Sequence, residues 1–101
     1  MPFLTDIRGK DDLAYSFQKF EEFEECIRGS ESIRAYIHTF DQRYNRLVKL
    51  NMTLPKPILA FKLLKGANIS KEQRMLVLTG LDFNDKERLY EQAKTSLSKS
   101  I

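Results

Sequence analysis

The sequence has few of the residues on which catalytic and metal-binding sites depend. Cys26 is its only cysteine and His38 its only histidine, so it contains neither an internal disulfide nor a Cys-x-x-Cys or His-x-x-x-His zinc motif. Gly29, Gly66 and Gly80 each stand alone, without the glycine-rich loop that holds phosphate groups. We therefore expect no enzyme, no cofactor and no metal, with Cys26 a packed thiol and His38 a solvated side chain.

Proline and long apolar runs are also scarce. The three prolines and four glycines lie near the expected ends of elements, which is typical of a helical bundle. No apolar run approaches the roughly 18 residues of a membrane span. A single cysteine fits a reducing compartment, so we expect a cytoplasmic chain that contacts no membrane.

The net charge is only +3, but basic side chains are the minority in the first third of the chain and acidic side chains are the minority in the rest. Residues 1–32 carry four basic and eight acidic side chains, whereas residues 33–101 carry thirteen basic and six acidic ones, giving −4 and +7. Such regions attract one another, within a chain or between chains. Solvated helix faces would give the same pattern. A nucleic-acid-binding face is a weaker alternative, because the lysines are dispersed and no aromatic side chains interleave with them.

Length and an apolar content of 42% support one small domain with a single core. Residues 1–10 lack periodicity and predict an N-terminal tail or linker, and residues 11–101 predict the helical domain. Asp11 or Asp12 is expected to cap the first helix. The expected apolar stripe of that helix consists of Leu13, Phe17, Phe20, Phe23 and Ile27. Four glutamates near its C-terminal end oppose the helix dipole, which predicts a basic neighbour.

The stretch from residue 27 to 50 predicts a turn that leads into a long amphipathic helix over about 32–50. Its apolar side chains recur at three- and four-residue spacing. These side chains are Ile33, Tyr36, Ile37, Phe40, Tyr44 and Leu47.

The next predicted helix, residues 54–65, is apolar on two arcs. One arc consists of Leu59, Ala60, Leu63 and Leu64, and the other of Leu54, Pro57, Ile58 and Phe61 with Lys65. A helix with two apolar faces is either central in its own domain or part of an interface. A capping box at Ser70–Gln73 predicts a short fourth helix using Met75, Leu76 and Leu78. The last helix is expected to bury Leu89, Tyr90, Ala93 and Leu97.

The turn and helix also carry a family resemblance. Gly29, Glu31, Tyr36, Ile37 and Phe40 stand almost as in the major homology region of retroviral and retrotransposon Gag capsid proteins. The chain departs from that motif at Arg28, where the family has Gln, and at Thr39, where it has Arg, and its turn is one residue shorter than in lentiviruses. Residues 12–98 resemble a capsid C-terminal domain.

The resemblance implies an all-α, compact five-helix bundle of the retroviral capsid C-terminal-domain type. It implies a structural module that dimerises and assembles within cytoplasmic capsid-like particles, with nucleic acid bound only by other Gag regions. The homology-region fold core would be Gly29, Glu31, Ile33, Tyr36, Ile37 and Phe40. The dimer interface would be Leu54, Pro57, Ile58, Phe61 and Lys65.

A related alternative is a host adaptor domain of the SCAN type. Such a domain also dimerises, but it exchanges its homology-region helix between chains. An exchanged dimer would hold the turn at Gly29 extended rather than folded back, so the path of this turn distinguishes the two.

Overall fold

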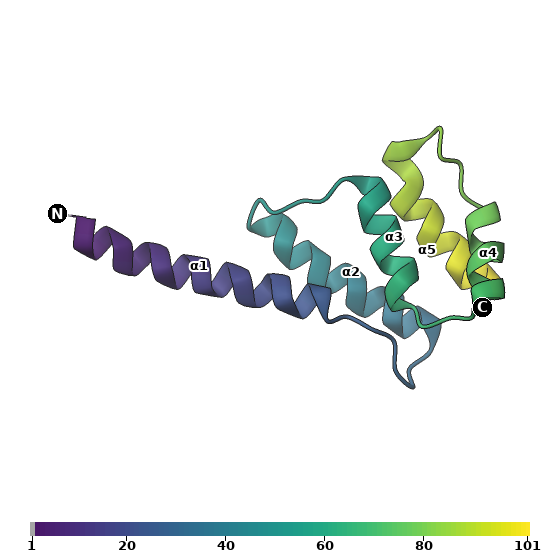
Figure 1. Ribbon diagram of the computed structural model, residues 1–101, viewed down its shortest axis with the longest axis horizontal. Helices are drawn as coiled ribbons and strands as arrows, with labels where there is room; N and C mark the ends of the chain where they lie inside the picture. The colour runs from purple at the N-terminus through teal and green to yellow at the C-terminus, as the bar shows by residue number, and fades with distance from the viewer. Residues whose placement is uncertain (1) are drawn as a thin grey trace.

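The protein is helical throughout the part of the chain that the computed structural model describes, which is the backbone of residues 2–101 and the side chains of residues 12–101. Five α-helices follow one another, with a short 3₁₀ turn before the last (Figure 1). This confirms the predicted all-α, five-helix class. None of the described helices is both long enough and apolar enough to cross a membrane.

The first helix, α1 (Pro2–Glu24), starts earlier than the expected cap at Asp11 or Asp12. Proline is tolerated in the first turn of a helix, and a single interior glycine costs only about 1 kcal/mol, so Gly9 does not end it. The backbone of the expected tail at residues 2–10 is therefore helical. The sequence also suggests that this segment docks Phe3, Leu4 and Ile7 onto the core or onto a partner, but these side chains lie outside the described residues.

The second helix, α2 (Ile33–Lys49), matches its prediction closely. The Ser32 hydroxyl caps it by accepting from the Ala35 N–H at 3.1 Å. Its apolar side chains face inward at helical spacing: Ile33, Tyr36, Phe40, Tyr44 and Leu47 are buried, and Ile37 is partly buried against them. The chain leaves α2 through Asn51, which takes a left-handed conformation with φ of 61°.

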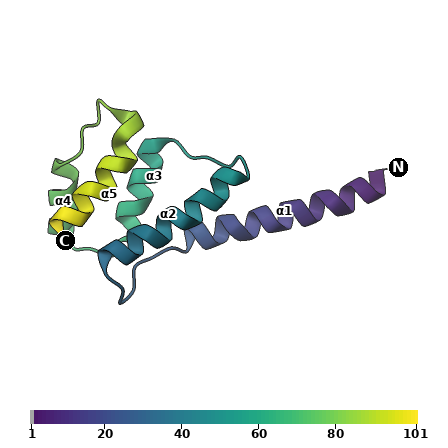
Figure 2. The same cartoon turned by 180° about the vertical axis from the view of Figure 1, so that it is seen from behind.

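The remaining helices are α3 (Lys56–Gly66), α4 (Lys71–Thr79) and α5 (Leu89–Ser100), with the 3₁₀ turn η1 (Lys86–Arg88) before α5. Both halves of the predicted capping box are present on α4, where Ser70 and Gln73 bond reciprocally. The left-handed residue after α3 is Asn68, with φ of 54°, and not Gly66 as a C-terminal glycine would suggest. In both views, α5 lies between α3 and α4 (Figures 1 and 2).

An aromatic cluster joins α1, α2 and α5. Phe23 of α1 lies 4.9 Å from Phe40 of α2 between ring centroids, and Tyr90 of α5 lies 6.1 Å from the same Phe40. The Tyr90 hydroxyl donates to the Asp41 carboxylate at 2.9 Å. Burial, and then this bond, raise the pKa of Tyr90. The four expected side chains of α5 are all buried: Leu89, Tyr90, Ala93 and Leu97.

Helices α2 and α3 approach most closely at Tyr36 and Gly66. The buried Tyr36 hydroxyl donates to the Leu63 carbonyl at 2.7 Å. A Cβ atom at Gly66 would lie 2.4 Å from that hydroxyl and 2.6 Å from the Cys26 carbonyl oxygen. Gly66 is thus required by close packing and not by a special backbone angle.

We therefore expect Gly66→Ala to lower the free energy of unfolding by about 1–3 kcal/mol, the usual cost of overpacking a core. Gly29→Ala is the matched control, because its added Cβ would meet only the Glu31 carboxylate, at 3.4 Å. Urea unfolding followed by circular dichroism measures both. Equal stability of the two variants would contradict the role assigned to Gly66.

Candidate interaction surface

The third helix has two apolar faces with different surroundings. Leu59, Ala60 and Leu63 are completely buried against the rest of the domain. On another side of the helix, Ile58 and Phe61 each keep 45% of their surface exposed, and Lys65 is also exposed. We call Ile58, Phe61 and Lys65 the α3 face. Large apolar side chains exposed together on one helix are typical of an interaction surface.

The other two residues predicted for the dimer interface lie closer to the core. Leu54 packs partly against the core, and its N–H donates to the Tyr44 hydroxyl at 3.2 Å. Pro57 is half-buried in the first turn of α3. The structure therefore leaves Ile58, Phe61 and Lys65 accessible, while Leu54 also has a role in holding the start of α3 against α2.

The homology-region residues are brought together around one turn. Ile33, Tyr36 and Phe40 are buried, with Ile37 beside them, while Gly29 and Glu31 lie exposed in the turn. The Glu31 carboxylate accepts from the Gly29 N–H. This bond closes the turn on itself ahead of α2.

Arg28, the residue at which the sequence departs from the homology motif, fastens this turn to the end of α3. Its N–H donates to the Gly66 carbonyl at 2.7 Å, and its guanidinium donates to the Ala67 carbonyl at 2.7 Å. It also reaches the Asn68 carbonyl at 3.3 Å. The last carbonyls of a helix lack partners within the helix, so Arg28 satisfies groups that would otherwise be unpaired.

The prediction that the apolar stripe of the first helix faces the core is wrong for most of its residues. Of its five residues, only Phe23 is buried, at 2% exposed. Leu13, Phe17, Phe20 and Ile27 are all exposed, Phe17 by 57%. The pattern predicted a helix here correctly, but α1 extends past the end of α2 (Figure 1), and Leu13 and Phe17 on its described turns remain exposed.

We call Leu13, Phe17 and Phe20 the α1 stripe. They are spaced at i, i+4 and i+7 and so lie on one side of the helix. The rings of Phe17 and Phe20 already contact each other, with centroids 6.4 Å apart. The spacing of these residues predicts that they share one side of a helix. Spacing alone does not show whether that side faces the core or the solvent.

The predicted core residues of the short helix α4 are also wrong. Val77 is its only buried residue, whereas the three predicted core residues, Met75, Leu76 and Leu78, are exposed. A helix of this length has room for one anchor against α5, and the Ser96 hydroxyl beside it donates to the Val77 carbonyl at 3.0 Å. Exposed apolar residues therefore occur at more than one place on the domain.

Basic side chains hold the acidic end of α1, as its glutamates predict. Arg43 of α2 donates to the Glu22 carbonyl at 2.6 Å, and Arg46 lies 3.4 Å from the Glu22 carboxylate. Lys62 of α3 pairs with Glu24 at 2.7 Å. These partly exposed pairs are each worth about 0–1 kcal/mol, so they orient α1 more than they stabilise it.

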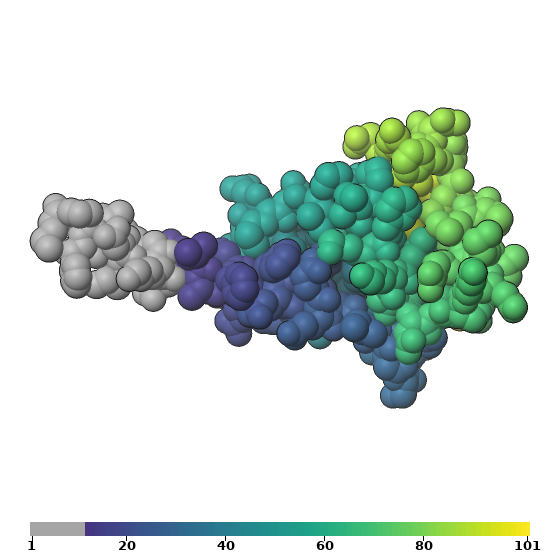
Figure 3. All heavy atoms as spheres, in the orientation of Figure 1, coloured from purple at the N-terminus to yellow at the C-terminus, as the bar shows by residue number. Residues whose placement is uncertain are grey.

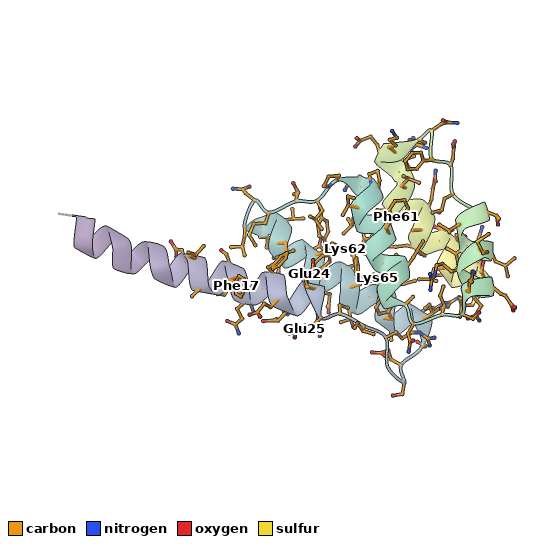
Figure 4. All side chains as sticks on the ribbon, in the orientation of Figure 1. Phe17, Glu24, Glu25, Phe61, Lys62 and Lys65 are labelled. Atoms are coloured by element: carbon orange, nitrogen blue, oxygen red, sulfur yellow. The ribbon has the colours of Figure 1, made fainter. Side chains whose placement is uncertain are left out.

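The junction of α1 and α3 contains a small groove of ≈ 180 Å³. Ile27, Lys62 and Lys65 are among the side chains that line it. Figure 4 shows Glu24 and Lys62 at this junction, with Phe17 farther out along α1 and Phe61 on α3. The groove therefore lies between the α1 stripe and the α3 face.

Cys26 and His38 lie in different elements, Cys26 buried just after α1 and His38 on α2. Burial raises the pKa of the Cys26 thiol, so it is protonated at neutral pH and a poor nucleophile. His38 is exposed on α2, as expected. Among the described residues, no three His, Cys, Asp or Glu side chains are grouped so that they could hold a metal ion.

Comparisons with known protein families, with curated proteins and with solved structures find no match to this chain.

The different burial of two phenylalanines on α1 gives a direct test of the stripe. We expect Phe23→Ala to cost about 3–5 kcal/mol of unfolding free energy, because it opens a cavity in the aromatic cluster. Phe17→Ala should change it by no more than about 0.5 kcal/mol, as for other exposed positions. Thermal unfolding at low protein concentration measures both. A large loss for Phe17→Ala would mean that the same chain already covers the stripe.

Proposed function

We propose that this chain is a self-association module of the Gag capsid type, which dimerises and so contributes to particle assembly. The observation that carries the proposal is the α3 face. The inner side of α3 is completely buried, yet Ile58 and Phe61 remain 45% exposed beside Lys65. A second copy of the chain is a partner that is always present with such a surface, and closed twofold dimers are the commonest oligomers.

The homology-region turn supports the capsid component of the proposal. Gly29 and Glu31 close the turn, and Tyr36 and Phe40 point from it into the core. Arg28 stands where the motif has Gln, and it attaches the turn to the end of α3 through main-chain carbonyls. This arrangement fixes α3 relative to α2 and keeps the α3 face turned outward.

The path of the same turn favours an unexchanged dimer over the SCAN-like alternative. The turn folds back, since the Arg28 N–H donates to the Gly66 carbonyl and the end of α1 packs on α2. In an exchanged dimer the turn would be extended, and these short contacts would be lost.

The affinity of one such module should be modest. The α3 face is small, and small interfaces give weak, reversible complexes, here roughly micromolar. Weak contacts suit assembly, because many copies joined in a particle bind together far more strongly than any single pair.

Charged substitutions on the α3 face test the proposal. Ile58→Asp and Phe61→Asp should each keep the helical circular-dichroism spectrum and abolish self-association in sedimentation equilibrium, because each replaces an apolar contact by a carboxylate that must lose its water at the interface. Leu76→Asp on α4 is the matched control, since Leu76 is 60% exposed and lies on a helix beyond α5. Dimers that persist in Phe61→Asp, or that disappear only in Leu76→Asp, would refute the α3 face.

A further inference from the structure

Two of the exposed apolar surfaces on the described residues meet at one junction, the α1 stripe and the α3 face. Figure 3 shows the end of α1 and α3 side by side on one side of the molecule. The Glu24–Lys62 ion pair connects them. They cannot cover each other within one chain, because α1 is a continuous helix whose Phe17 lies away from α3 (Figure 4). A partner must cover them both.

Charge decides which partner fits the α3 face. From Lys56 to Gly66, α3 carries Lys56, Lys62 and Lys65 and no acidic residue. Lys62 is paired with Glu24, so two α3 faces packed against each other would bring the unpaired Lys65 side chains into one interface without an acidic partner from α3. Like charges across an interface are unfavourable.

The α1 stripe has the complementary charge. Glu21, Glu24 and Glu25 follow its last residue, Phe20. Glu21 and Glu25 are exposed and form no ion pair with any described residue, and the same holds for Lys65 on α3. Each apolar surface thus has unpaired charge beside it, negative on α1 and positive on α3.

We propose that the α3 face of one copy binds the α1 stripe of a second copy, and that the pair is reciprocal. This inference rests on the proposed self-association and identifies its contacts. The arrangement is twofold and closed, so each copy contributes one α1 stripe and one α3 face. It covers both apolar surfaces at once, whereas an α3–α3 dimer leaves the α1 stripe in water.

The groove at the junction supports this pairing. It lies beside Lys65 and is lined in part by the side chains of Phe23 and Ile27. An apolar floor with a lysine rim suits a large apolar side chain that is followed by a carboxylate. Phe20 followed by Glu21 on a second copy has this chemistry.

Charge reversal with rescue tests the pairing. Lys65→Glu and Glu21→Lys, each alone, place like charges at both contacts of the dimer, so we expect association to weaken by at least about tenfold. An equimolar mixture of the two variants restores one native contact and creates one reversed pair, so its association should recover. Glu72→Lys on α4 is the control and should associate like the wild type. Sedimentation equilibrium with one labelled variant measures each case.

The outcomes separate this inference from the function on which it rests. Recovery in the mixture supports the pairing, and it also shows that both variants are folded. If the Glu21→Lys variant dimerises as strongly as the wild type, or if the mixture of the two variants stays dissociated, the pairing is overturned. The proposed self-association still stands in either case. A stronger complex between Lys65→Glu and the wild type than either forms alone would instead assign an α3–α3 dimer. A wild-type chain that stays monomeric at every concentration overturns both proposals.

Discussion

The close contact between α2 and α3 at Tyr36 and Gly66 is the constraint on which the rest of the structure depends. The Tyr36 hydroxyl satisfies the Leu63 carbonyl inside the core, and burial raises its pKa, so it remains a proton donor at all physiological pH values. Because Gly66 has no Cβ, the turn after α1 can reach the end of α3, where Arg28 bonds to three successive carbonyls, those of Gly66, Ala67 and Asn68. This contact therefore joins α2, the end of α3 and the turn after α1.

The consequence of this geometry is apolar surface that the domain cannot bury by itself. The inner side of α3 is used by the core, so Ile58 and Phe61 must lie outside. The C-terminal end of α1 is held by Phe23 and by arginines of α2, whereas Leu13 and Phe17 remain exposed. Acidic groups end the first surface and basic groups border the second. Within the chain, the charge asymmetry of the sequence forms ion pairs between α1 and its neighbours. In the proposed dimer, it also makes the two surfaces complementary in charge.

Much of the fold was predictable, because its strongest signals are local. The apolar period predicted α2, and the capping box at Ser70–Gln73 predicted the start of α4. For the long helix α1 and the short helix α4, the sequence did not predict which apolar side chains face the core. The spacing of Leu13, Phe17 and Phe20 is that of a core helix, yet α1 extends past its support. Val77 alone anchors α4, since contact with α5 depends on tertiary geometry that periodicity does not contain. The α3 face was identified because a helix with two apolar arcs has more apolar surface than one core can use.

The most direct test of this account is the concentration dependence of individual NMR signals, because it reports which side chains a partner covers. Side-chain spectra recorded from about 10 μM to about 1 mM span the range in which a weak dimer forms. The account predicts that signals of Leu13 and Phe17 on α1 and of Ile58 and Phe61 on α3 shift together, with one binding curve, while Leu76 on α4 does not move. Spectra that stay unchanged over this range would contradict the claim that a second copy covers these surfaces.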